Sequence, residues 1–183
     1  YSVAAFNAKG DNITDDTAAI NLAATVAKNN FAKLIGKKGT YLVTATIQLE
    51  CDGDLSEMFI EADGAAVSPV VRFGTTSGAA TSYRRMLLPR VRNNARISGV
   101  WGAGVGVEIA NSNTNSLYVP STAEFDVGLD LGGYNSGCAY NNIELGYIYS
   151  NKRNLRMSPK SATGWANQNT FIGGRIGFNT IDF

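Results

Sequence analysis

Three carboxylates in the second half of the chain, Asp126, Asp130 and Glu144, could by their type carry acid–base chemistry. Hydrolysis of a glycosidic bond uses two carboxyl groups, about 5–5.5 Å apart with retention or about 6.5–9.5 Å apart with inversion. On one strand Asp126 and Asp130 would face the same side, whereas Glu144 alternates with Ile143 and Leu145 and should point outward. For each of them we favour the plainer interpretation, a solvated position on the outer face.

Aromatic and arginine side chains form a second group, which is suited to sugar binding. Aromatic rings stack on the apolar faces of sugars, and guanidinium groups bind hydroxyl and carboxylate groups. The plainer interpretation for each residue is packing within the fold or at an interface. Tyr147 and Tyr149 should share one face of a strand, because strand side chains alternate. The candidates are Trp101, Tyr134, Tyr147, Tyr149, Arg153 and Trp165.

Other reaction classes find little support in the sequence. Histidine is absent, which removes the commonest general base and metal ligand. The acidic pairs Asp15-Asp16 and Asp52/Asp54 could offer oxygens to calcium, but they lack an EF-hand series, so we expect helix capping and turn formation instead. We therefore expect no metal and no cofactor. Cys51 and Cys138 match no ligand spacing, and we favour two buried free thiols over a disulfide.

Composition limits the partners. The 183 residues are 44% hydrophobic and 17% charged, with a formal net charge of +1. A nucleic-acid partner is not expected, since such proteins carry clustered basic residues and a high pI. Membrane insertion is not expected either, because no apolar run reaches roughly 18–20 residues. The one basic cluster is interpreted as the solvated edges of strands and turns; it comprises Arg84, Arg85, Arg90, Arg92 and Arg96.

The elements that must position these residues are one helix and many short strands. A helix is predicted over about 15–29, with Ile20, Ala23, Ala24 and Ala27 at helical spacing. Short apolar runs broken by Gly, Asn and Ser follow, and they favour a sandwich, a barrel or a β-solenoid. The expected strands are Lys33–Ile35, Thr40–Val43, Thr46–Leu49, Met58–Glu61, Val70–Phe73, Arg96–Val100, Val105–Ile109, Phe125–Leu131, Asn142–Tyr149, Asn154–Met157 and Asn169–Phe178.

From Val105 onward the segments recur at roughly 20–25 residues, which is about one turn of a solenoid. The reference points are Ile109, Leu131, Leu155 and Ile176. Periodicity alone favours a solenoid only slightly over a sandwich.

Two stretches carry a family resemblance. Phe6–Ile20, followed by a helix and by Gly39–Val43, resembles the opening of the pectin-lyase-like right-handed parallel β-helix superfamily, with left-handed-tolerant Asn7 and Asn12 where glycine is usual. Tyr140–Tyr149 and the runs up to Ile176 resemble bacteriophage tailspikes and tail-associated capsule depolymerases.

The resemblance implies a mainly β, single-stranded right-handed parallel β-helix. Residues 1–45 would form an N-terminal cap and the first strands, and 46–183 the coils of a β-helix truncated at its C-terminus. It further implies a homotrimer in the virion tail, other phage tail proteins as partners, and bacterial surface polysaccharide (capsule or O-antigen) as ligand, which the full-length form would cleave. The alternatives are a non-enzymatic structural or adhesive virion tail protein and a free bacterial polysaccharide lyase.

Overall fold

The computed structural model describes residues 1–62, 67–93 and 104–177. The protein is mainly β, and the one α-helix among these residues, α1 (Thr17–Asn29), lies where the sequence predicts a helix. The predicted strand Arg96–Val100 and the candidate Trp101 fall outside the described residues. The other predicted strands each overlap an observed one.

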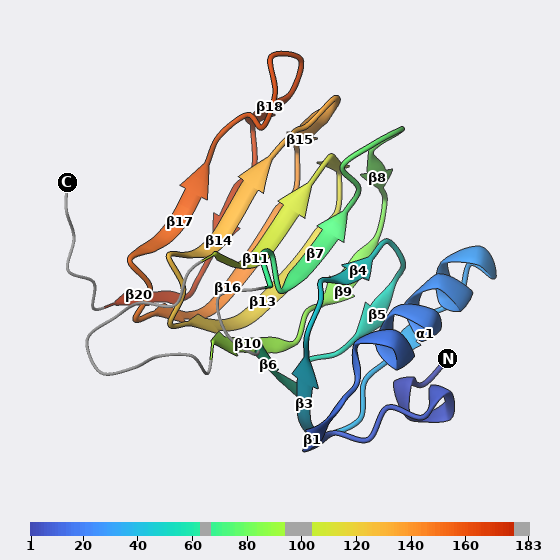
Figure 1. The fold of residues 1–183 in the computed structure, drawn as a ribbon. Coiled ribbons are helices and arrows are strands. Elements are labelled where there is room, and N and C mark those ends of the chain that lie inside the picture. Colours follow the sequence, from blue (N-terminus) through green and yellow to red (C-terminus); the bar gives the residue numbers. More distant parts are fainter. Residues whose placement is uncertain (63–66, 94–103, 178–183) are drawn as a thin grey trace.

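The chain coils so that each strand pairs in parallel with a strand of the next coil, giving three stacked sheets (Figure 1). Sheet A contains β1 (Asp11–Asp15), β2 (Leu34–Ile35), β3 (Gly39–Val43), β5 (Gly53–Asp54), β6 (Met58–Ala62), β9 (Arg85–Leu87), β10 (Arg90–Asn93), β13 (Ser116–Ala123), β16 (Asn142–Tyr149), β19 (Thr170–Ile172) and β20 (Arg175–Gly177). Sheet B contains β4 (Ile47–Leu49), β7 (Val71–Gly74), β11 (Val105–Ala110), β14 (Val127–Gly132) and β17 (Arg153–Met157). Sheet C contains β8 (Thr81–Ser82), β12 (Ser112–Asn113), β15 (Gly137–Ala139) and β18 (Trp165–Asn167). This arrangement is compatible with a parallel β-helix.

Sheet A consists of two rows of strands joined by the long strands β13 and β16. The first halves of β13 and β16 continue the row of β9, and the second half of β13 continues the row of β10. In β16 the buried positions are Ile143 and Leu145 before Gly146, but Ile148 after it. The alternation therefore shifts by one residue at Gly146, which lets one strand serve both rows.

The core lies between the sheets and consists of inward side chains stacked coil upon coil. Ile109 pairs with Leu131, as the repeat predicts. The other two reference points are wrong: Leu155 pairs with Leu129, two residues from the expected position, and Ile176 pairs with Ile148 in a different sheet. Parallel register between distant strands decides this stacking, and spacing along the chain does not reveal it.

Buried asparagines hold the turn between sheets C and A. Asn141 Nδ2 donates to Ser112 O over 2.7 Å and to Asn169 Oδ1 over 2.8 Å. Asn115 Nδ2 donates to Thr81 O over 2.9 Å. Because these side chains replace water as partners of buried backbone groups, the same corner can repeat in successive coils.

Helix α1 packs its buried face, which includes Ile20 and Ala23, near β4 and β2. Of the two acidic residues before it, Asp15 makes the expected contact with the start of the helix, because its carboxylate accepts the N–H of the first helical residue, and Asp16 does not. Asp16 makes no cap bond to the helix, and its carboxylate accepts hydrogen bonds from the backbone N–H groups of Lys9 and Gly10. Asp15 instead accepts bonds from Thr17.

Asn7 and Asn12 both have left-handed backbone conformations, with φ of 71° at Asn7 and 60° at Asn12. This confirms the prediction that these asparagines support left-handed turns. Asp54 also forms its expected turn, since its carboxylate accepts bonds from the N–H and hydroxyl of Ser56.

Candidate functional site

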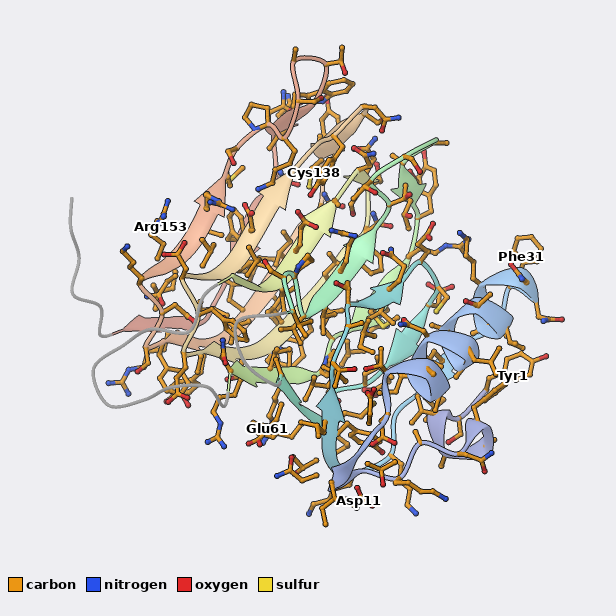
Figure 2. The ribbon with its side chains drawn as sticks, in the orientation of Figure 1. Tyr1, Asp11, Phe31, Glu61, Cys138 and Arg153 are labelled. Carbon is orange, nitrogen blue, oxygen red and sulfur yellow. The ribbon has the colours of Figure 1, made fainter. Side chains whose placement is uncertain are left out.

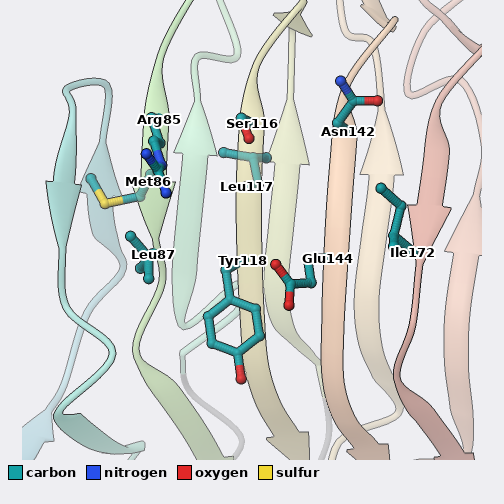
Figure 3. A pocket seen from close by; sticks show the side chains of 9 residues that line it. All are labelled: Arg85, Met86, Leu87, Ser116, Leu117, Tyr118, Asn142, Glu144 and Ile172. Carbon is teal, nitrogen blue, oxygen red and sulfur yellow. The ribbon is translucent and has the colours of Figure 1, made fainter.

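Two adjoining hollows lie on the outer face of sheet A, and together they are called the sheet A groove. The first, of about 260 Å³, is lined by Arg85, Met86, Leu87, Ser116, Leu117, Tyr118, Asn142, Glu144 and Ile172 (Figure 3). The second, of about 840 Å³, is lined by Phe59, Arg90, Tyr118, Pro120, Ser121, Gly146, Tyr147, Tyr149, Gly174, Arg175 and Gly177. Tyr118 belongs to both hollows, so they adjoin at its ring.

Tyrosine side chains form part of the lining of the second hollow. Tyr147 and Tyr149 are exposed on the same face of β16, as predicted, with ring centroids 6.2 Å apart in an edge-on arrangement. The guanidinium carbon of Arg175 lies 5.8 Å from the Tyr147 centroid. Small residues such as Ser121 and Gly146 contribute to the lining, so the tyrosine rings remain accessible above the strands.

Glu144 lies in the first hollow and is exposed, which confirms its predicted outward orientation. It pairs across strands with Tyr118, and both side chains project from neighbouring strands in Figure 3. Among the described residues that line the two hollows, Glu144 is the only carboxylate. A hydrolase with two carboxylates would need a second one close to it.

The other two candidate acids belong to sheet B, away from the groove. Asp130 is 0% exposed: Arg156 Nε donates to its Oδ1 over 3.1 Å, and Lys160 also donates to it. In the preceding coil Glu108 is likewise buried and accepts a 2.6 Å bond from Arg72 Nε. The expectation of a solvated position is therefore wrong for Asp130, because the cationic side chains of Arg156 and Lys160 cover it.

Asp126 immediately precedes β14 and is half-buried. Its carboxylate lies 3.3 Å from Arg153 and 3.8 Å from Lys152. Figure 2 shows the Arg153 side chain extending away from the sheet. Arg153 is thus an exposed ion-pair partner on sheet B and lies outside the lining of the groove.

Tyr134 follows β14, and its side chain forms a hydrogen bond to a residue of sheet B. Its hydroxyl donates to Glu108 Oε1 over 2.7 Å. Burial, together with the neighbouring Glu108 carboxylate, raises the pKa of Tyr134 to about 12, so the phenol stays neutral. Trp165 is exposed on sheet C. Of the predicted sugar-binding residues within the described chain, the structure brings only Tyr147 and Tyr149 into the groove.

The described residues contain no group of three or more Cys, Asp or Glu side chains that could hold a metal ion. Cys51 and Cys138 are free and buried, as the sequence favours. Burial raises their pKa values to about 11 and about 12, which keeps both thiols protonated. No helix in the described parts of the chain is long and apolar enough to span a membrane.

Several groove residues, among them Tyr118, Arg85, Arg90 and Arg175, are not among the residues that the sequence predicts for the site. Tyr118 lies on β13, a strand that the sequence does not predict. Arg85 and Arg90 belong to a cluster interpreted as solvated edges; they are exposed, but they also line the groove. Arg175 falls within the predicted strand Asn169–Phe178, but no signal in the sequence assigns it to a binding site. An alternation of polar and apolar residues over 116–119 was the available signal for β13.

The three sheets consist of parallel strands from successive coils, and the sheet with the most strands carries the open groove. By its fold the protein is therefore a β-helix-like coil. Among solved structures, the chain is similar to ORF18 of Geobacillus virus E2, with 16% identity and a TM-score of 0.54 over 94% of this chain. The match covers 41% of that protein, so the chain spans less than half of its length. At this identity the likeness shows the fold alone.

A second similar structure is the A-module of mannuronan C-5 epimerase AlgE4 from Azotobacter vinelandii, with 17% identity. The match covers 96% of this chain and 74% of that one, with a TM-score of 0.34. No family model matches the sequence, and no curated protein does.

Proposed function

We propose that the protein is a phage tailspike-type receptor-binding protein that binds bacterial surface polysaccharide, capsule or O-antigen, through the sheet A groove. The observation that carries this proposal is the set of tyrosine rings around an open hollow of about 840 Å³. Aromatic rings stack on sugar faces, while side chains such as Asn142 and Ser116 in the adjoining hollow can bond hydroxyl groups. An open groove also suits a polymer that extends beyond it at both ends.

The finer architecture belongs to the same proposal. The chain forms a right-handed parallel β-helix in which residues 1–45, with α1, cap the first coil and 46–183 continue the coils. An uncovered terminal coil would expose apolar core, so a cap at this end has a physical reason. Three such chains would assemble as a homotrimer in the virion tail, beside other tail proteins. The fold likeness to a Geobacillus virus protein is consistent with a phage source.

Binding is better supported than cleavage. Glu144 is the candidate acid in the groove, whereas Asp126 and Asp130 hold cations on sheet B. This separation favours the non-enzymatic adhesive tail protein as the second candidate function. Long incubation of the full-length protein with a bound polysaccharide distinguishes the two: a fall in chain length indicates a depolymerase, and an unchanged length an adhesin.

The binding proposal is tested with Tyr147→Ala on an array of purified capsular and O-antigen polysaccharides. We expect the wild-type protein to bind at least one of them and the variant to bind it about tenfold more weakly, which corresponds to about 1.4 kcal/mol of lost stacking. Affinity is measured by biolayer interferometry.

Tyr83→Ala is the matched control, because Tyr83 is a highly exposed tyrosine that does not line the groove. It should bind like the wild type. Equal losses in both variants, or no binding of the wild-type protein to any polysaccharide, would contradict the proposal.

A further inference from the structure

The arginines of the described chain fall into two groups. Most of them lie within 4 Å of a carboxylate: Arg72 of Glu108, Arg84 of Asp52, Arg92 of Glu61, Arg153 of Asp126 and Arg156 of Asp130. Arg85, Arg90 and Arg175 form no ion pair within the described residues, and all three line the sheet A groove. Among the described residues, the arginines that the fold leaves without a carboxylate partner are therefore gathered at the proposed binding surface, whereas the unpaired lysines Lys9, Lys33, Lys37 and Lys38 do not line it.

The second hollow is the more strongly cationic. Arg90 and Arg175 line it, and none of its described lining residues is acidic. The guanidinium groups of the described arginines outside the groove each lie within 4 Å of a carboxylate, which offsets their charge. A guanidinium that faces an open groove keeps its planar fork of N–H donors free, and this fork matches a carboxylate in two parallel hydrogen bonds.

The two arginines also have a defined spacing along the coil. Arg90 is on β10 and Arg175 on β20, and β13 and β16 lie between these strands. Because neighbouring strands lie about 4.8 Å apart, the three strand spacings between the two residues amount to about 14 Å along the coil axis. Ser121 and Tyr147 occupy the same row in between, paired with each other. A linear ligand along this row would meet a cation, a small residue, an aromatic ring and a second cation.

We propose that the sheet A groove selects a polyanionic, carboxylate-bearing polysaccharide, which lies along the coil axis and binds two of its acid groups at Arg90 and Arg175. The intervening sugar stacks on Tyr147. This inference rests on the proposed function and adds the chemical class of the glycan. A neutral polysaccharide would leave the guanidinium groups without a charged partner.

The test first screens the protein against an array of uronate-containing and neutral glycans, and the glycans that bind are then studied further. Each bound uronate glycan is compared with its carboxyl-reduced form, which keeps the backbone but loses the charge. We expect the binders to be uronate glycans and reduction to weaken binding at least tenfold. The double variant Arg90→Gln/Arg175→Gln should show a similar loss, and circular dichroism should show an unchanged fold, because Arg90 and Arg175 are exposed.

Arg153→Gln is the matched control, since it removes an exposed arginine from sheet B, outside the groove. Its affinity should stay within twofold of the wild type. Polyglutamate and the oligonucleotide dT20 serve as polyanions without sugar; binding of either as tight as that of the glycan would overturn the inference in favour of a general anion surface.

The remaining outcomes separate the two proposals. Binding of a neutral or carboxyl-reduced glycan that depends on Tyr147 but is unchanged by Arg90→Gln/Arg175→Gln would overturn this inference and leave the proposed function standing. Binding to no glycan in either set would overturn the proposed function itself.

Discussion

At the scale of single residues, Asp126 and Asp130 place the same side chain in two environments. Asp126 is half-buried, and its ion pairs with Lys152 and Arg153 are open to solvent. Asp130 is buried between Arg156 and Lys160, which are themselves largely covered. Water screens the first set of pairs, whereas in the second a cation that loses its partner cannot be solvated freely.

The Asp130→Asn variant should therefore lower the free energy of unfolding by about 3 kcal/mol, because it leaves two cations beside a neutral amide. The measurement is urea unfolding followed by circular dichroism. Asp126→Asn, the matched control, should cost less than about 1 kcal/mol. Equal effects of the two substitutions would show that burial does not strengthen the sheet B ion pairs.

At the scale of elements, the end of β7 shows how closely neighbouring coils approach. Gly74 has a φ of +95°, and a Cβ atom added there would lie 1.9 Å from the backbone oxygen of Ala110 in the next coil. A backbone oxygen cannot move aside as a flexible side chain can. Gly78, in the following turn, also has a positive φ of +77°, but no atom lies within 4 Å of a Cβ atom added there.

Comparison of Gly74→Ala with Gly78→Ala separates the clash from the backbone strain. The strain of a left-handed alanine should cost about 1–2 kcal/mol at either position. Gly74→Ala should cost several kcal/mol more and lower the thermal midpoint well below that of Gly78→Ala, as measured by differential scanning calorimetry. Similar midpoints would mean that the coils can move apart at little cost.

At the scale of the whole molecule, the last described strands leave core positions uncovered. Ile176 occupies the same inward row as Ile148, yet it is 54% exposed, because among the described strands β20 pairs with β16 alone. Ile13, Leu22 and Ile35 are also exposed on the surface. Single aliphatic side chains exposed in this way are normal on a protein surface and do not by themselves define an interface.

As the resemblance to tailspikes implies, we expect the protein to form a homotrimer in solution, with a mass of about three times 19.4 kDa. Light scattering after size-exclusion chromatography measures this mass directly, and dilution over a tenfold range shows whether the assembly persists. A mass near 19.4 kDa at all concentrations would contradict the trimer and favour the monomeric lyase alternative.

Several features follow from the sequence by itself because their causes are local. Helical spacing of apolar residues over 17–29 predicts α1, and alternation over 142–149 predicts which side chains of β16 face outward. The left-handed conformations of Asn7 and Asn12 follow from residue type and motif. Tyr147 and Tyr149 share a face for the same local reason.

Only the tertiary structure decided the rest, because the strands that stack on one another are distant in sequence. Asp130 and Arg156 are 26 residues apart, and the lengths of the intervening turns set their register. That register buries Asp130 and places Ile176 in sheet A instead of sheet B. It also gives carboxylate partners to some arginines and leaves Arg90 and Arg175 without one in the groove. Residue type supplied the cations and the rings, and parallel stacking determined which of them remain available to a ligand.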